Sequence, residues 1–133
     1  MNFEIYCYTN EDGREPVQEY IENLTEPEQA KVYAYLGHLE EVGYQVRRPF
    51  GDYLGAKTEL YELRPGRNRI LYFFLHRGKI ILLHAFLKKT QEIPEREMNT
   101  ALKRKEMCKI ALKYKAVRYL ILKKEGDLCK TKK

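Results

Sequence analysis

The sequence predicts an α+β fold in which an antiparallel sheet of about four strands is packed by an N-terminal helical hairpin and a long C-terminal helix. Three observations lead to this prediction. Apolar residues recur at helical spacing within residues 16–42, apolar runs typical of strands fill residues 58–87, and a further helical pattern follows Pro94. With 133 residues, 44% of them hydrophobic, the chain is long enough to build one domain with its own core.

The N-terminal part predicts a short strand followed by two helices. Apolar and polar residues alternate over residues 3–8, as they do in a strand. Pro16 suits the first turn of a helix. Thr25 is followed three residues later by Glu28, which is a capping-box pattern, and Gly43 suits the end of that second helix. Two short helices joined by a tight turn are therefore expected.

The middle of the chain predicts the sheet. Three strands are expected at about 58–64, 69–76 and 79–87. The links between them are too short for crossover helices, so the strands should be antiparallel neighbours. The preceding residues 44–57 contain Pro49, Gly51 and Gly55 and are expected to form an irregular loop.

A last helix is predicted to begin at Pro94 and to end near Gly126, with residues 127–133 as a frayed tail. Its apolar stripe is expected to pack on the same domain, and a dimer contact is the alternative. The stripe consists of Met98, Ala101, Leu102, Met107, Ile110, Ala111, Tyr114, Val117 and Ile121.

Charge is distributed unevenly along the chain. Residues 1–63 contain 5 Lys or Arg and 13 Asp or Glu, whereas residues 64–133 contain 20 and 6. The second half therefore carries a balance of +14, which favours a polyanionic partner, although a solvated basic face without a partner would look the same. No apolar run approaches the roughly 20 residues that span a bilayer. The start of the chain lacks the features of a secretory signal, and three cysteines without C-x-x-C spacing suit a reducing cytoplasm and argue against structural zinc.

Two segments resemble a known superfamily. The run LYELRPGRNRILYFF, followed by IILLHAFLKKTQEIPEREMNTALKR, resembles the RelE/HigB/ParE superfamily of bacterial and phage toxins, and most closely its HigB-like, phage-associated branch. The resemblance implies a RelE-like toxin domain over residues 1–104. Residues 105–133 would be a C-terminal helical extension with a basic tail that belongs to the same globular unit.

The resemblance also implies a function. The protein would be the toxin of a type II toxin–antitoxin system and a metal-independent endoribonuclease without cofactors, which cleaves mRNA, usually on the ribosome, by attack of the ribose 2′-hydroxyl on the adjacent phosphorus. Its partners would be mRNA, the ribosome and a cognate antitoxin, expected to be of the helix-turn-helix type, and the extension could offer that antitoxin a groove. A homo-oligomer is left open. The alternatives are a ParE-like inhibitor of DNA gyrase and an RNA-binding remnant without activity, because one fold can carry several functions.

Five residues are predicted to be catalytic. Arg64 and Arg69 flank the Pro-Gly turn, where two guanidinium groups could hold one phosphate and its extra charge in the transition state. Lys88 and Lys89 follow the last strand, where the superfamily places basic catalytic residues, and alternation suggests that one of them faces the site. His84 could act as general acid or base, but a histidine buried in the sheet is an equal alternative.

A further set is predicted to bind RNA through charge or through stacking on bases. These residues are Arg47, Arg48, Lys57, Tyr61, Arg67, Tyr72 and Phe86, although core packing is the favoured role for Tyr72 and Phe86. One departure stands out. Some ribosome-dependent relatives carry lysines before the Pro-Gly turn, where this chain has Glu59 and Glu62. Either a glutamate takes part in the chemistry or the basic work moves to the preceding loop.

Overall fold

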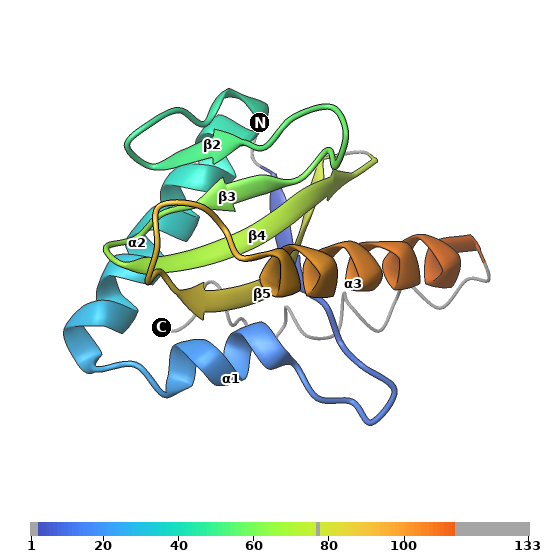
Figure 1. Ribbon diagram of the computed structural model, residues 1–133, viewed down its shortest axis with the longest axis horizontal. Coiled ribbons are helices and arrows are strands. Elements are labelled where there is room, and N and C mark those ends of the chain that lie inside the picture. Colours follow the sequence, from blue (N-terminus) through green and yellow to red (C-terminus); the bar gives the residue numbers. More distant parts are fainter. Residues whose placement is uncertain (1–2, 77, 114–133) are drawn as a thin grey trace.

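The computed structural model describes residues 3–76 and 78–113, and within these ranges the chain forms one five-stranded mixed sheet and three α-helices (Figure 1). In chain order the elements are β1 (Glu4–Cys7), α1 (Pro16–Glu22), α2 (Glu26–Val42), a 3-10 turn (Gly43–Gln45), β2 (Gly51–Tyr53), β3 (Tyr61–Leu63), β4 (Asn68–Leu75), β5 (Lys79–Leu87) and α3 (Glu95–Lys113). Within the described ranges, no helix is long and apolar enough to cross a membrane.

The caps of α1 and α2 form as the sequence predicts. Pro16 opens α1. At the start of α2 the Thr25 hydroxyl accepts a hydrogen bond from the Glu28 N–H, and the Glu28 carboxylate accepts one from the Thr25 N–H. The helix ends at Gly43, whose φ of 52° is a conformation that favours glycine. A side chain at this position would also collide with the ring of Phe3.

The sheet is larger than predicted and is not wholly antiparallel. Its strand order is β1-β5-β4-β3-β2, and β1 runs parallel to β5. The remaining neighbours are antiparallel. The predicted four-stranded antiparallel sheet is corrected in two places, because β1 pairs with a strand far away in the sequence and β2 lies inside the segment expected to be an irregular loop. A pairing between segments far apart in the chain leaves no local pattern in the sequence, and the three residues of β2 are too few to show one.

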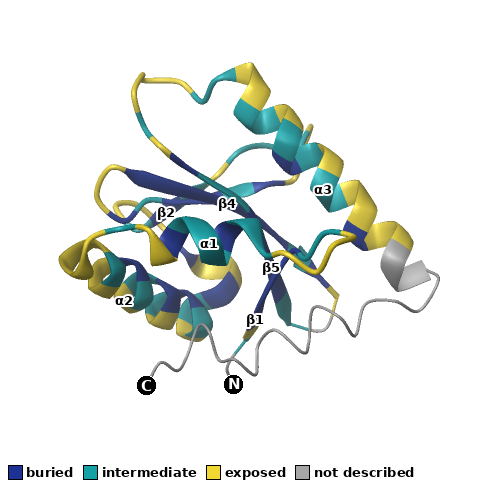
Figure 2. Cartoon of the chain, turned by 90° about the horizontal axis from the view of Figure 1, so that it is seen from below, coloured by how far each residue is buried: buried dark blue, intermediate teal, exposed yellow. Residues whose placement is uncertain are grey.

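The helices cover the two faces of this sheet unequally. Helices α1 and α2 lie on one face and α3 on the other (Figure 2). Against α1 and α2 the buried side chains form a large apolar cluster that includes Ile5, Val17, Ile21, Leu36, Leu39, Ile70 and Tyr72. Against α3 a second cluster includes Tyr6, Leu60, Leu71, Phe73, Ile81 and Ala101. Because α3 begins only at Glu95, part of its face of the sheet is left without a covering helix.

The pairing of β4 with β5 contains a one-residue irregularity. Leu83 is an extra residue between Leu82 and His84, whose partners on β4 are adjacent to each other. Successive strand side chains normally point to opposite faces. Here, however, Leu83 packs in the cluster under α3 and His84 also contacts α3, so the alternation changes phase. Beyond this point Phe86 also faces the α3 side.

Helix α3 buries the first part of the predicted stripe but not the rest. Ala101 is buried and Met98 and Leu102 pack against the same cluster, as predicted. Farther along the helix Cys108 is buried against the sheet, whereas Met107 and Ile110 are exposed. At 100° per residue, Cys108 lies almost directly above Ala101, while Met107 and Ile110 turn away, so their predicted burial is wrong. The helix is unbroken through residues 103–106. The predicted stripe residues Tyr114, Val117 and Ile121 and the tail lie outside the described residues.

Candidate catalytic cleft

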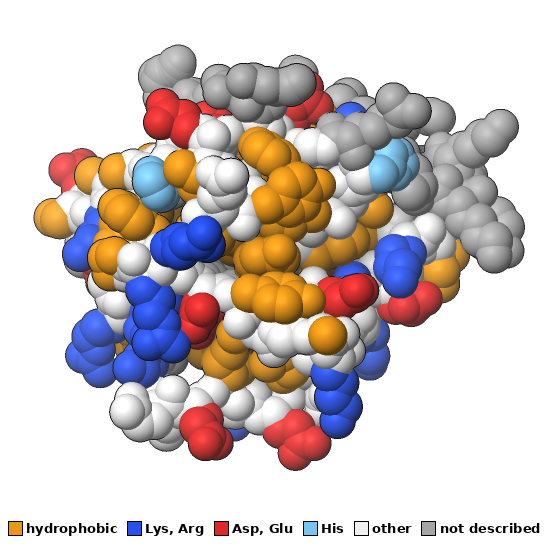
Figure 3. Space-filling view, turned by 90° about the horizontal axis from the view of Figure 1, so that it is seen from above, with side chains coloured by type: hydrophobic (Ala, Val, Ile, Leu, Met, Phe, Trp, Pro, Cys, Tyr) orange, Lys and Arg blue, Asp and Glu red, His pale blue; other side chains and the backbone are white. Residues whose placement is uncertain are grey.

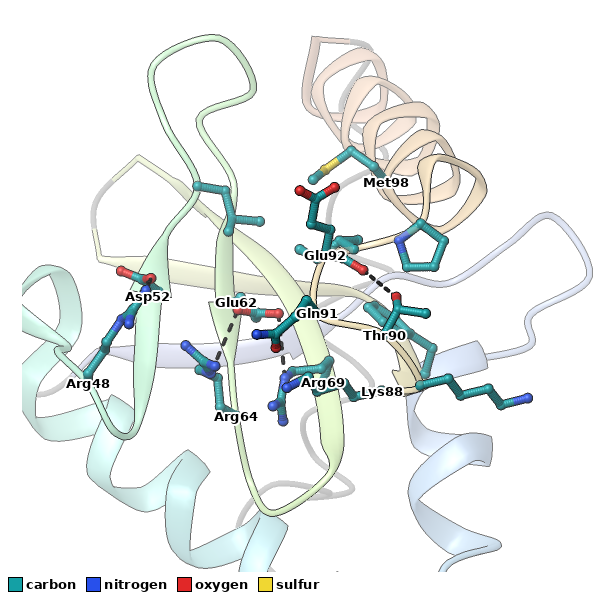
Figure 4. A pocket seen from close by; sticks show the side chains of 15 residues that line it. Arg48, Asp52, Glu62, Arg64, Arg69, Lys88, Thr90, Gln91, Glu92 and Met98 are labelled. Carbon is teal, nitrogen blue, oxygen red and sulfur yellow. Dashed lines mark hydrogen bonds and ion pairs between the residues drawn. The ribbon is translucent and has the colours of Figure 1, made fainter.

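A cleft of about 340 Å³ opens where the α3 face of the sheet is left without a covering helix. One wall is built by β2, β3 and β4, and the other by the segment 88–94 and the start of α3 (Figure 4). The segment is held in shape partly by its own contacts, since the Thr90 hydroxyl donates a 2.7 Å hydrogen bond to the Glu92 carbonyl oxygen. Phe86 of β5 also lines the cleft.

Basic side chains from four separate segments line this cleft. They are Arg48 before β2, Arg64 after β3, Arg69 in β4, and Lys88 and Lys89 after β5. The predicted cationic residues Arg64, Arg69, Lys88 and Lys89 therefore share one hollow. Lys88 is half-buried and Lys89 is exposed. The Lys88 ammonium is close enough to Glu62 to favour the ionised carboxylate, whereas Lys89 also lines a second hollow that lies towards Tyr20.

Arg69 is the most buried of these cations, with 6% of its surface exposed. Its Nη1 donates 2.8 Å hydrogen bonds to the carbonyl oxygens of Gly66 and Asn68, and its Nε lies 3.6 Å from Glu62 Oε2. Arg69 therefore holds the Pro-Gly turn in shape and neutralises Glu62. Arg64 is more accessible, and its Nε lies 3.9 Å from Glu62 Oε1.

Glu62 lies at the centre of the cleft. Figure 4 shows Arg64 and Arg69 both reaching towards its carboxylate. The side chain is buried, and this burial raises the pKa of Glu62 above the ordinary carboxyl value of 4.5, against the opposing effect of Arg64, Arg69 and Lys88. A raised pKa in a cleft of cations is typical of a carboxyl group that moves protons. The sequence signals this residue only as a departure from the superfamily pattern.

A second acid lies beside Glu62 on the neighbouring strand. Asp52 of β2 pairs with Glu62 of β3 in the sheet register. Its Oδ2 accepts hydrogen bonds from Arg48 Nε at 3.1 Å and Arg48 Nη2 at 2.8 Å. Asp52 thus neutralises Arg48 at the rim of the cleft. The guanidinium groups of Arg64 and Arg69 lie farther from Glu62, at 3.9 Å and 3.6 Å.

His84 does not belong to this cleft. Its Nε2 lies 2.6 Å from Glu97 Oε1 of α3, and Arg104 of the same helix lies 3.4 Å from Nδ1. Burial lowers the pKa of His84, although the hydrogen bond with Glu97 opposes this effect. The irregularity at Leu83 turns His84 under α3, where it joins the helix to the sheet, which is the position that the structural alternative predicts. A catalytic role of His84 stays a prediction that this cleft does not support.

The predicted RNA-binding residues are divided between several locations. Among the described residues of this set, Arg48 and Phe86 line the cleft, whereas Arg47, Lys57 and Arg67 are exposed outside it. Tyr61 lines a separate hollow at the other end of β3. Tyr72 is fully buried under α1 and α2, so it has the favoured core role and its predicted alternative, stacking on bases, is wrong. Its position in β4 directs its side chain to the α1/α2 face.

Within residues 3–76 and 78–113, no group of three or more His, Cys, Asp or Glu side chains is arranged to hold a metal ion. The cleft offers the buried carboxyl group of Glu62, the more accessible carboxyl groups of Asp52 and Glu92, and several guanidinium and ammonium groups. Such a set can accept a proton beside a bound phosphodiester and stabilise added negative charge on its oxygens.

The family can be assigned from the sequence of the domain. Residues 19–106 match the family described as phage-derived protein Gp49-like (DUF891), and the chain belongs to this family. The family is of the RelE/HigB-like toxin type and is associated with the toxins of toxin–antitoxin systems. The matched residues contain every residue that lines the cleft. None of the curated proteins matches the chain.

Proposed function

We propose that this protein is the toxin of a type II toxin–antitoxin system, of the HigB-like branch, and that it cleaves mRNA on the ribosome in the cleft around Glu62. One observation carries the proposal. A buried carboxyl group with a raised pKa lies between two guanidinium groups in an open hollow that two lysines also line. Phosphodiester cleavage needs both a proton acceptor and a cationic surface, and the same cleft supplies both.

In the proposed reaction the Glu62 carboxylate accepts the proton of a ribose 2′-hydroxyl. The 2′-oxygen then forms a bond to the adjacent phosphorus, and the bond from phosphorus to the 5′-oxygen of the next nucleotide breaks. That oxygen takes up a proton from water, so the products are a 2′,3′-cyclic phosphate and a 5′-hydroxyl. Arg64 and Lys88 stabilise the extra charge on the phosphoryl oxygens. Arg69 acts through the position and charge of Glu62, because its Nη1 is bound to two carbonyl oxygens.

The first experiment compares the glutamate of the cleft with an exposed glutamate elsewhere. Wild type, Glu62→Gln and Glu41→Gln are induced briefly in bacteria, and transcript 5′ ends are sequenced. Glu41 is the control, because it is an exposed glutamate of α2 that lines neither the cleft nor the hollows at Tyr20 and Tyr61. We expect Glu62→Gln to lower cleavage about 10²- to 10⁴-fold, the usual contribution of a general base, and Glu41→Gln to cleave like wild type.

Cleavage by Glu62→Gln at the wild-type rate would refute the assignment of the base. Growth arrest by wild type with DNA damage signalling and intact transcripts would instead indicate a gyrase inhibitor. Binding of RNA without any new 5′ ends in wild type would indicate an inactive RNA-binding protein.

The pH dependence offers an independent check. Glu62 can accept a proton only when it is ionised, and burial raises its pKa. Cleavage of mRNA on purified ribosomes should therefore rise with pH along a limb centred above the ordinary carboxyl value. This limb should be absent from the residual activity of Glu62→Gln. A wild-type rate that is constant throughout the acidic range would contradict the role.

A further inference from the structure

A third hollow, of about 320 Å³, lies at the end of β3 away from the Pro-Gly turn. We call it the aromatic notch, and the side chains that matter in it are Tyr44, Tyr53, Tyr61, Phe74, Lys105 and Lys109. The first residue of β3, Tyr61, pairs with Tyr72 of β4, whereas β4 continues to Leu75. The notch lies beside the part of β4 that β3 does not cover. Viewed from the β2 edge of the sheet, a band of hydrophobic side chains crosses the molecule, with Lys and Arg side chains on both sides (Figure 3).

Two tyrosine rings in the notch are exposed yet held in place. Tyr44 is 54% exposed and Tyr53 is 47% exposed. Tyr53 packs on Tyr61 with ring centroids 4.8 Å apart, and Tyr61 stacks in turn on the buried Tyr72 at 5.4 Å. Tyr44 rests on Phe74 at 4.2 Å. Each outer ring is thus held by an inner ring, so less side-chain entropy is lost when a ligand stacks on it.

The charges beside these rings favour an anionic ligand. Lys105 lies over the ring of Phe73 and donates a 2.7 Å hydrogen bond to the Thr58 carbonyl oxygen. Its ammonium is 3.8 Å from Glu59, the one acidic residue among the described residues of the notch. Lys109 is exposed and repels Lys105, so it adds positive charge at the rim. Aromatic faces next to lysines are the combination that binds single-stranded nucleic acid.

The notch and the catalytic cleft use neighbouring residues of the same two strands. Tyr53 directly follows Asp52, and Tyr61 directly precedes Glu62. Because successive strand residues point to opposite faces, the two tyrosines lie on the α1/α2 side of the sheet and Glu62 lies on the α3 side. Since β2 is the last strand at this edge of the sheet, an RNA strand that occupies both hollows must pass around the β2 edge.

We propose that the aromatic notch is a stacking subsite for an unpaired base of single-stranded RNA, a short distance along the strand from the phosphate bound at Glu62. The base lies on Tyr53 and Tyr44, and Lys109 contacts a flanking phosphate. This inference rests on the proposed function for the identity of the ligand, but its test needs no cleavage.

The experiment measures binding of a fluorescent 2′-O-methyl oligoribonucleotide by anisotropy. The 2′-O-methyl group removes the nucleophile, so that affinity is read without cleavage. Tyr53→Ala should weaken binding about 5- to 150-fold, the range found when one stacking ring is removed, whereas Tyr53→Phe should bind like wild type. Met107→Ala on α3 is the control for loss of an exposed apolar side chain outside the notch.

Two further arms separate stacking from charge. An oligonucleotide with abasic positions should bind wild type and Tyr53→Ala with equal affinity, because no base is left to stack. Lys109→Ala should reduce the salt dependence of binding. Lys103→Ala, which changes an exposed lysine of the same helix outside the notch, should not.

Equal affinity of wild type and Tyr53→Ala for the intact oligonucleotide would overturn the proposal, whatever the cleavage activity. A change in the sedimentation of Tyr53→Ala without a change in RNA affinity would also overturn it, by assigning the notch to contact with a second copy of the chain. Loss of cleavage in Glu62→Gln with unchanged oligonucleotide binding would support both proposals, because it would assign cleavage to Glu62 and binding to other residues.

Discussion

The two faces of the sheet are packed in different ways, and the difference explains where the cleft lies. On the face under α1 and α2, apolar side chains fill the space between helices and strands. On the other face α3 covers only part of the sheet, and β3 and β4 carry Glu62 and Arg69 beside the part that it leaves open. Among the described residues, the segment 88–94 and the start of α3 border these polar groups across the cleft. The α1/α2 face is therefore closed by apolar packing, whereas the α3 face combines an apolar cluster with an open part that forms the site.

The strongest test of this contrast removes the buried cation of the cleft. Arg69→Ala would leave Glu62 without its buried partner and two carbonyl oxygens without their donor. We expect the free energy of unfolding in urea to fall by about 3–5 kcal/mol. Arg64→Ala, at the more accessible cation, should change it by less than about 1 kcal/mol while lowering cleavage. Equal stability of the two variants would contradict the structural role of Arg69.

The opposite face should respond in stability alone. Leu36 of α2 is fully buried in the cluster that lies against the sheet. Leu36→Ala should lower the free energy of unfolding by about 2–5 kcal/mol through lost burial and the cavity that it leaves. Cleavage per folded molecule, measured at a temperature where the variant stays folded, should equal that of wild type. A specific loss of cleavage would show that the two faces are coupled.

A smaller effect is expected where α3 is joined to β5. His84→Phe removes the partner of the partly buried Glu97 and should cost about 1–3 kcal/mol of stability without reducing cleavage. Because burial lowers the pKa of His84, the neutral ring is favoured in the folded protein. Wild-type stability should then decline as the pH falls below about 6.5 and through the lowered pKa. The difference in the free energy of unfolding between wild type and His84→Phe should therefore become smaller over the same pH range. Loss of cleavage in His84→Phe would return this histidine to the catalytic group.

The smallest effect is expected at the start of α2, far from the cleft along the chain. Thr25→Ala removes the hydroxyl that caps Glu28 N–H and should cost about 1 kcal/mol, measured by thermal unfolding. Thr25→Ser keeps the hydroxyl and should restore most of that stability. A loss of cleavage that exceeds the loss of folded protein would contradict the division between the two faces.

The parts of the fold that could be predicted from sequence are those with local causes. Pro16, Thr25 and Gly43 mark helix ends through contacts within a few residues, and the structure places the ends there. The pairing of β1 with β5 depends on residues far apart in the chain, so no local pattern announces it. The cleft follows the same division. Arg64 and Lys88 could be proposed from their positions beside strands, but the burial of Glu62 depends on four segments that meet only in the folded molecule.

The irregularity at Leu83 also decides which side chains of β5 line the cleft. In a regular strand that continued from Leu83, His84 and Phe86 would point to the α1/α2 face, and Ala85 and Leu87 would point to the α3 face. The extra residue reverses this assignment, so that Phe86 lines the cleft and Ala85 packs under α1 and α2. Because the pairs on both sides of Leu83 are already adjacent on β4, a deletion of this residue would leave the following side chains on their present faces, whereas a deletion elsewhere in the second half of β5 would exchange the faces of the residues beyond it.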